Sequence, residues 1–271
     1  MKKFLSVLMA GAMLFGVLTL AGCGDTTTDT GEDTTTTEDT TTTAEFTTVT
    51  EGVLTMSTNA AFPPYEMTDD SGNVVGIDAE IAGAIADKLG LELVIDDMDF
   101  DAAQLAVQQG KSDICMAGLS VTEDRLLVMD FSDSYATGIQ VVIVPEGSDV
   151  TLDNLGEQLI GTQRATTGNI YCTDDYGEDH VIAYDDGIVA VQDLLNGKVD
   201  AVVIDKAPAQ EFVAANPGLV ILDTEYANED YAIGVAKGNT ALVDAVNGAL
   251  AELTADGTIQ SIIEKYIPAE G

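Results

Sequence analysis

The chain of 271 residues has few basic side chains: 10 Lys and Arg stand against 47 Asp and Glu, which gives a formal net charge of −37 at pH 7. Nucleic acids and anionic membrane surfaces attract positive charge, so this balance argues against both as partners. The scarcity also makes each arginine informative, because each one departs from an acidic background.

Histidine and the common motifs of catalytic and metal sites are equally scarce. His180 is the single histidine, and the sequence has no Cys/His metal spacing, no Gly-rich phosphate loop and no Gly-x-Ser-x-Gly turn. We therefore expect neither a metal nor a cofactor. Of the three cysteines, Cys115 falls in a predicted strand and Cys172 in a predicted helix, where a disulfide or two buried free thiols would both fit.

Residues 1–22 have the features of an export signal. Two lysines precede an apolar run, residues 4–20, which is too short for a spanning helix. The run ends LAGC, which resembles the bacterial lipobox, in which the cysteine becomes the first residue and carries lipid on its thiol. We predict a lipid anchor on Cys23, with an ordinary secretory signal as the alternative.

Residues 23–51 follow the predicted anchor and are almost entirely Thr, Asp and Glu up to residue 50. Such a segment has too little apolar surface to offset the entropy lost on ordering. We predict a disordered tether between the lipid and the folded part.

The rest of the chain alternates between strand and helix patterns. The predicted strands are 53–57, 91–95, 113–116, 138–144, 159–160, 181–184 and 201–204. The first predicted helix begins at an Asp78 cap and ends at Gly90, and the others are 101–109, 167–175 and 188–196. Alternation of this kind predicts an α/β fold with a mostly parallel sheet that helices cover on both faces.

The segment 117–125, AGLSVTEDR, follows one of these buried strands. Thr122 with two acids behind it predicts a helix N-cap, so a strand, a turn and a helix meet here. The helix-start N–H groups, the Ser120 hydroxyl and the Arg125 guanidinium are suited to binding a small carboxylate. The alternative is a structural arginine paired with a nearby acid.

A local repeat relates the two halves of the chain. QGKSDI at 109–114 and NGKVDA at 196–201 share one pattern, and aligning them places Gly118 opposite Asp205. Ligands of open α/β sheets bind at the carboxyl ends of strands. Arg125 lies near the end of one such strand and Asp205 at the end of the other. Their opposite charges match the carboxylate and the ammonium group of a free amino acid. The alternative for Asp205 is the N-cap of a helix that begins before Pro208.

Several motifs then point to one family: NAAFPPYE (59–66), GID (76–78), MDF (98–100), AGLSVTEDR (117–125), DFS (130–132), TTG (166–168), DAVVID (200–205) and LTADGTI (253–259). Over residues 51–267 the chain resembles the family 3 extracellular solute-binding proteins, the polar amino-acid receptors of ABC importers. The resemblance implies a two-lobed periplasmic-binding-protein-like fold of type II. Lobe 1 would be 52–135 plus 232–267, lobe 2 would be 140–227, and the hinge strands would be 136–139 and 228–231.

The resemblance also implies roles for individual residues. Arg125, Ser120 and the N–H of Thr167 would bind the α-carboxylate of the ligand. The carbonyl of Gly118, Ser120 and the carboxylate of Asp205 would bind its α-ammonium group. Aromatic and amide side chains would surround the ligand side chain, namely Phe62, Phe100, Asn59 and Gln163, together with Ile204.

The expected ligand and partners follow from these roles. No carboxylate is predicted around the side chain of the ligand, so we expect the ligand to be a neutral L-amino acid. Arg164 would lie at the rim of the site, so an acidic amino acid is the alternative ligand. The protein would be a monomer, lipid-anchored outside the cytoplasmic membrane, that delivers its ligand to an ABC permease. The alternatives are a prephenate or arogenate dehydratase on the same fold and a ligand sensor. No positioned acid–base pair supports the enzyme.

Overall fold

The computed structural model describes residues 46–223 and 225–267. The elements of the first part are β1 (Val53–Thr58), β2 (Ala61–Phe62), β3 (Glu66–Thr68), β4 (Val74–Val75), α1 (Ile77–Leu89), β5 (Glu92–Asp97), α2 (Phe100–Gln108), β6 (Ile114–Cys115), α3 (Glu123–Val128) and β7 (Met129–Pro145). Those of the next part are η1 (Leu152–Glu157), β8 (Ile160–Gln163), α4 (Thr167–Tyr176), η2 (Glu178–His180), β9 (Val181–Tyr184), α5 (Gly187–Leu195), β10 (Ala201–Asp205), α6 (Lys206–Ala215) and β11 (Leu219–Ile221). β12 (Ala227–Ala236), α7 (Thr240–Ala255) and α8 (Thr258–Tyr266) close the described chain.

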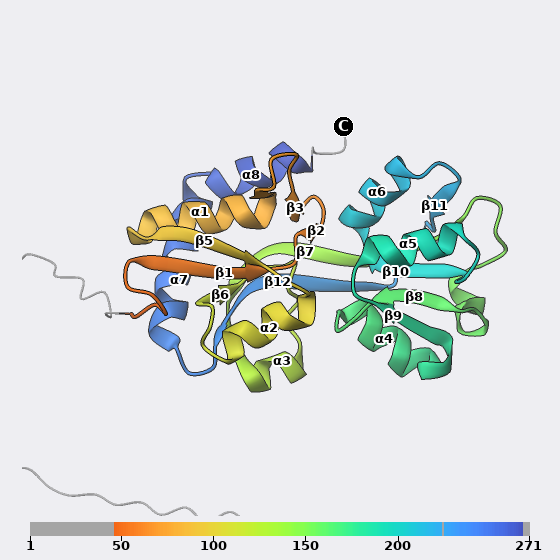
Figure 1. Ribbon diagram of the computed structural model, residues 1–271, viewed down its shortest axis with the longest axis horizontal. Helices are drawn as coiled ribbons and strands as arrows, with labels where there is room; N and C mark the ends of the chain where they lie inside the picture. Colours follow the sequence, from red (N-terminus) through yellow and green to blue (C-terminus); the bar gives the residue numbers. More distant parts are fainter. Residues whose placement is uncertain (1–45, 224, 268–271) are drawn as a thin grey trace, which may run out of the picture. The chain divides into compact units, whose positions relative to one another are not determined.

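One long sheet organises these elements, with the order β5-β1-β6-β12-β7-β10-β8-β9 and β11 paired to β7. Strands β5, β1 and β6 are parallel, and so are β10, β8 and β9. Between these two groups run β12 and β7, which pair antiparallel with each other and with their other neighbours. Figure 1 shows these two strands connecting the two groups. The α/β prediction is confirmed, with parallel pairing inside each group.

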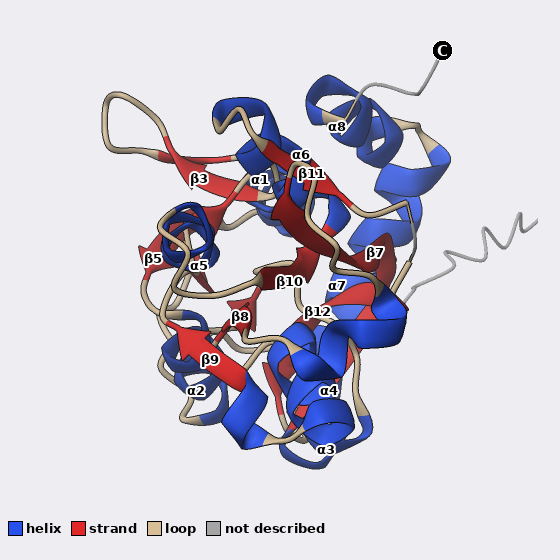
Figure 2. Ribbon diagram, turned by 90° about the vertical axis from the view of Figure 1, so that its right-hand side faces the viewer, coloured by secondary structure: helices blue, strands red, loops and turns tan. Residues whose placement is uncertain are grey.

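Helices cover both faces of the sheet, as predicted. In Figure 1, α1 lies above the first group of strands, and α2 and α3 lie below it. In the second group, α6 and α4 lie on opposite sides of β10 in both Figure 1 and Figure 2. β10 accordingly buries apolar side chains on both faces, since the successive residues Val202 and Val203 are each 1% exposed and pack in different clusters.

Local signals in the sequence account for some of the helix ends. Gly90 ends α1 in a left-handed conformation, and Thr122 caps α3 by accepting a hydrogen bond from the Arg125 N–H at 3.2 Å. The prediction that Asp78 caps α1 is wrong. Gly76 holds the N-cap position, and Asp78 lies inside the first turn with a buried carboxylate that bonds elsewhere.

The largest differences from the predicted elements are in pairing that is distant in sequence. β7 begins at Met129, nine residues before the predicted strand, because it pairs along its length with β12. The small sheet β2-β3-β4 and the elements β11, α7 and α8 were not predicted, whereas β12 contains the expected hinge strand 228–231 and α6 is the helix of the capping alternative. The small sheet matters most, because it places residues 62–66 beside the ends of the main strands.

The N-terminal predictions fall mostly outside the described residues. The export signal, the lipid anchor on Cys23 and most of the tether lie in residues 1–45. The final residues of the predicted tether are ordered, which corrects its boundary: Phe46 packs against the core, and the Val49 N–H donates to Asp113 at 2.6 Å. No helix among the described residues is long and apolar enough to cross a membrane. Cys115 and Cys172 are both buried free thiols.

Candidate ligand-binding site

A narrow cavity lies where strands of both groups end. Its walls come from the carboxyl ends of β1, β6, β8 and β10, where open α/β sheets bind ligands. The lining residues are Asn59, Phe62, Glu66, Phe100, Ala117, Gly118, Ser120, Arg125, Gln163, Thr166, Thr167 and Asp205. Nine of the ten residues that the sequence analysis places around the ligand are among them, all except Ile204.

The segment 117–125 forms one wall of the cavity. Gly118 has a φ of +52°, which other residues rarely adopt, and a Cβ at this position would lie 2.7 Å from Cε1 of Phe62. Beyond this turn the segment is fixed to β12, because the Ala232 N–H donates to Leu119 and the Val121 N–H donates to Asp230. The chain therefore reaches the start of α3 in a defined position.

Arg125 is held inside the cavity by these connections. It is only 6% exposed, and its guanidinium donates to the carbonyls of Ser120 at 2.7 Å and Ala165 at 3.0 Å. Its Cζ lies 5.5 Å from the centre of the Phe100 ring. Among the described residues, no carboxylate forms an ion pair with it. Burial lowers the pKa of Arg125, and three of its five N–H donors are left for a ligand.

The opposite wall at this point is the turn before α4. Ala165 has a φ of +61°, the only positive φ of a non-glycine residue in the described chain, and its carbonyl accepts from Arg125. Arg164 points elsewhere. It is half exposed and pairs with Asp185 at 3.1 Å, so the expectation that it reaches the cavity rim is wrong.

Asp205 ends β10 on the far side of the cavity from the first group of strands. Its carboxylate accepts hydrogen bonds from the amide of Gln140 at 2.8 Å and from the hydroxyl of Tyr231. It occupies the N-cap position of α6, as the capping alternative expected, but its side chain caps no N–H. Burial raises the pKa of Asp205 to about 7.

Glu229 of β12 is a second buried carboxylate beside Asp205, and the sequence did not identify it. One of its oxygens accepts from Ser120 at 3.0 Å, from Thr167 at 2.8 Å and from Gln140 at 3.1 Å. Its repulsion contributes to the raised pKa of Asp205. Nothing in the sequence separates Glu229 from the other acids of this acidic chain, because its burial depends on the distant pairing of β12 with β7.

Glu66 is a third buried carboxyl and the second one that the sequence did not assign. It has no exposed surface, and no N–H or O–H donor of the described residues reaches either carboxyl oxygen. It contacts Asp78, whose two oxygens accept from the Gly118 N–H at 2.9 Å and the Tyr135 hydroxyl at 2.8 Å. Burial and the Asp78 carboxylate raise the pKa of Glu66 well above its ordinary value.

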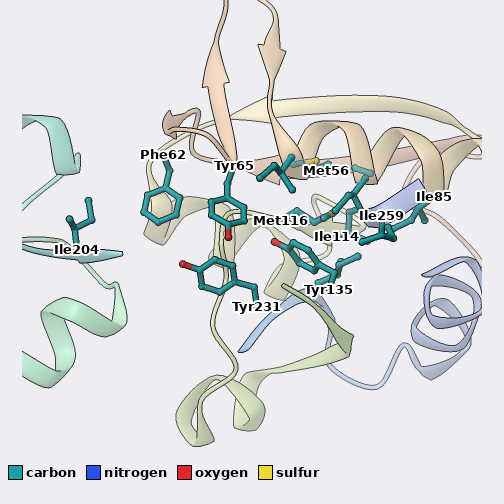
Figure 3. Close-up of a cluster of buried hydrophobic side chains, with 14 of the residues drawn as sticks. Met56, Phe62, Tyr65, Ile85, Ile114, Met116, Tyr135, Ile204, Tyr231 and Ile259 are labelled. Carbon is teal, nitrogen blue, oxygen red and sulfur yellow. The ribbon is translucent and has the colours of Figure 1, made fainter. Parts of the chain in front are cut away.

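The remaining wall contains amides and aromatic rings. Gln163 donates to Asn59 at 2.8 Å, and Asn59 donates to Asp186 at 3.3 Å, so these side chains link the two groups of strands. Figure 3 shows Phe62 beside Tyr65, which lies against Tyr231 at 5.2 Å between ring centres. Ile204 does not line the cavity, contrary to expectation. Its side chain packs against Gly187, where a Cβ would lie 2.5 Å away.

This site belongs to a fold and a sequence pattern that known proteins share. Residues 54–269 match the bacterial extracellular solute-binding proteins, family 3. The chain is a member of that family. Members are solute-binding receptors rather than enzymes, they act outside the cytoplasm, and relatives of this chain serve ABC transporters. The dehydratase alternative is accordingly not favoured.

Several relatives indicate what such receptors bind. The chain is 29% identical over its full length to a "Probable histidine-binding protein" of Neisseria gonorrhoeae, of which it covers 97%. It is 29% identical to "ABC transporter arginine-binding protein 1" of Escherichia coli, over 79% of this chain and 90% of that protein. An ancestral arginine-binding protein, solved with arginine, matches 79% of this chain and 98% of its own length at 39% identity and a TM-score of 0.75. An ancestral arginine-binding protein solved with glutamine matches 80% of this chain and 98% of its own length, at 38% identity and a TM-score of 0.76.

Proposed function

We propose that the cavity binds one free amino acid with a cationic side chain, arginine first among them, for delivery to an ABC permease. One observation carries the proposal: the cavity buries an unpaired guanidinium, Arg125, together with carboxyl groups at two separate places, Asp205 and Glu66. A buried charge without a partner is costly, so a ligand that supplies the opposite charges gains affinity from each. Arginine carries one carboxylate and two cations.

The α-carboxylate would bind at Arg125. The donors left on this side chain point into the cavity, and a planar guanidinium binds a carboxylate in a bidentate fork. Thr167 is the first residue of α4, whose ten residues direct unpaired N–H groups and a positive dipole end toward the same space. The Ser120 hydroxyl lies beside them, but its single O–H donates to Glu229 at 3.0 Å, which leaves its oxygen as an acceptor.

The α-ammonium would bind at Asp205 with the carbonyl of Gly118. Both residues line the cavity, and Asp205 comes from the opposite group of strands to Gly118. Glu229 adds negative charge behind this position and holds the hydroxyls of Ser120 and Thr167 in place. The α-carbon of the ligand would therefore join the two groups.

The cationic end of the side chain would bind at Glu66. The expectation of a neutral ligand took no account of Glu66, which also lines the cavity. Phe62 and Phe100 would pack on the aliphatic part of the ligand. The arginine-binding relatives support this choice.

A neutral amino acid with a side-chain amide, such as glutamine, is the second candidate. Asn59 and Gln163 line the same wall with amides that can donate and accept, and an ancestral relative is known with glutamine bound. With this ligand Glu66 would have to be protonated, because an ionised carboxylate would have no cation to pair with.

Delivery would proceed by closure of two lobes, with the boundaries expected from the sequence. β7 and β12 connect the two groups of strands, so a change in their backbone angles at 136–139 and 228–231 would move one group against the other. Asn59 and Arg125 already contact residues of the second group, Gln163 and Ala165, across the cavity. A lipid on Cys23 would keep the receptor, a monomer, beside its permease.

Calorimetric titration of the purified mature protein with arginine, lysine, histidine, citrulline and glutamine tests the proposal. We expect the tightest binding for arginine. Glu66→Gln should weaken arginine binding by roughly 2–5 kcal/mol, because the guanidinium of the ligand would be buried without a partner. Asp70→Asn on the same hairpin is the control, since Asp70 is exposed. Equal affinity for arginine in wild type and Glu66→Gln would refute the side-chain assignment, and no binding of any amino acid would refute the function.

A further inference from the structure

Glu66 and Asp78 form a pair of buried carboxyl groups that the ligand roles above do not fully explain. Both are completely buried, and they contact each other. Two carboxyl groups in contact can hydrogen-bond only when one of them carries a proton, and two adjacent negative charges in a buried site repel strongly. A single shared proton removes both problems.

The surroundings decide which carboxyl holds that proton. Asp78 accepts hydrogen bonds from Gly118 and Tyr135 at its two oxygens, which favours its charged form. Glu66 has no donor at either oxygen among the described residues, so nothing stabilises its charge. The proton therefore belongs on Glu66, from which it can be donated to Asp78.

The other ionisable groups near Glu66 reinforce this assignment. Cys115 of β6, Tyr65 beside β3 and Tyr135 of β7 are neutral at physiological pH, because burial raises the pKa of each. Asp205 of β10 adds negative charge, and the one cation of the cavity, Arg125 of α3, is held by Ser120 and Ala165. No described cation pairs with Glu66.

We infer that Glu66 is a proton-coupled selector: it is protonated in the free protein, and a cationic ligand side chain displaces that proton to solvent, whereas a neutral side chain leaves it in place. The inference rests on the proposed function, because it requires the ligand side chain to reach Glu66. The step breaks one O–H bond on Glu66 and transfers the proton to buffer. The ligand cation then pairs with the carboxylate, so the charge inside the cavity changes little.

The coupling would make ligand choice depend on pH. Binding that releases one proton strengthens about tenfold for each unit of rising pH, as long as Glu66 is protonated in the free form and ionised in the complex. Any amino acid also brings an ammonium group to Asp205, whose pKa is raised in the free protein. Asp205 therefore releases a similar amount of proton with every ligand. The difference between a cationic ligand and its neutral analogue isolates Glu66. Acidic surroundings would favour the neutral ligand, and neutral surroundings would favour the cationic one.

Arginine and citrulline provide the matched pair, because citrulline replaces the guanidinium with an uncharged urea group. Calorimetric titrations near pH 6.5, in buffers of different ionisation enthalpy, measure the protons released by each ligand. We expect wild type to release about one proton more with arginine than with citrulline. In Glu66→Gln the arginine value should fall to the citrulline value, and in Asp70→Asn it should not change.

Difference infrared spectroscopy supplies a readout that does not depend on citrulline affinity. Arginine binding should remove a protonated-carboxyl C=O band from the wild-type spectrum, and that band should be absent from free Glu66→Gln. Equal proton release for the two ligands, a difference that persists in Glu66→Gln, or no loss of the band with arginine bound would each overturn the inference. Failure of arginine to bind at all would instead refute the proposed function.

Discussion

Arg125→Ala tests the charge arrangement of the cavity directly. Among the described residues Arg125 is the only cation that lines the cavity, so without it the α-carboxylate of any amino-acid ligand would be buried without a partner. Truncating one member of a buried charge pair costs about 3–5 kcal/mol. At 1.4 kcal/mol for each factor of ten, the dissociation constant should rise roughly 100- to 4,000-fold.

A thermal-unfolding assay converts this loss into a shift of Tm. Ligand at a thousand times the wild-type Kd stabilises the folded protein by about 4 kcal/mol. For a chain of this size, roughly 2–4 °C per kcal/mol gives a rise of about 8–16 °C. At the same ligand concentration, Arg125→Ala should retain at most about 1.5 kcal/mol, or roughly 3–6 °C.

Arg164→Ala is the matched control. Arg164 is the other arginine of the chain, but its side chain is 51% exposed and its ion pair with Asp185 lies outside the cavity. Exposed pairs of this kind contribute about 0–1 kcal/mol, so the ligand-induced shift should match wild type. A normal shift in Arg125→Ala would refute the site, and so would loss of the shift in Arg164→Ala.

Three further predictions concern other parts of the chain. Cys23→Ser should release the protein from membranes or leave it unprocessed, which fractionation and intact-mass measurement can show; wild type free in the medium with an unmodified Cys23 at its start would contradict the lipid anchor. Gly118→Ala should lower the unfolding free energy of the free protein by at least about 1–2 kcal/mol and weaken binding, because Gly118 has a φ of +52° and a Cβ there would contact Phe62. The control is Gly72→Ala, whose Cβ lies in open space, so this variant should cost only the backbone strain. Raising the pH from 5 to 8 should lower the stability of the free protein. The pKa of Asp205 is raised to about 7 in the folded protein, so Asp205 contributes stability at low pH that is lost as the pH rises through that value. Asp205→Asn should flatten the pH profile of Tm, and an unchanged profile would show that Asp205 is ionised throughout.

The fold could be predicted from the sequence where local patterns determine it. The strand and helix alternation, the Gly90 stop and the Thr122 cap are signals within a few residues of one another, and each is present in the structure. β7 and β12 were harder to predict, because strand pairing across about a hundred residues leaves no local signal. The extent of β7 before residue 138 depends on that pairing.

The residues of the candidate site could likewise be predicted only where a local sequence pattern marks them. The residues that follow the ends of predicted strands, such as Gly118 and Asp205, were found because the local repeat aligns those ends. Glu66 was not assigned, because the small sheet β2-β3-β4 that buries it was not predicted. Glu229 falls in the expected hinge strand 228–231, but its burial depends on the distant pairing of β12, for which the sequence has no local signal. In a chain with 47 acidic residues, composition cannot distinguish a buried carboxylate from an exposed one.

The buried charges explain why stability and binding should be coupled in this protein. Among the described residues, Arg125 is buried without a carboxylate partner and Glu66 without a cation, so Glu66 holds its proton, and Asp205 lies beside Glu229; this arrangement lowers the stability of the free form. An amino acid supplies the missing charges, and its carboxylate and ammonium would contact residues from both groups of strands. A ligand that lacks either charge leaves one buried group unpaired, and it should neither bind tightly nor hold the two groups together. Selectivity for amino acids and closure of the cavity would therefore have the same physical cause.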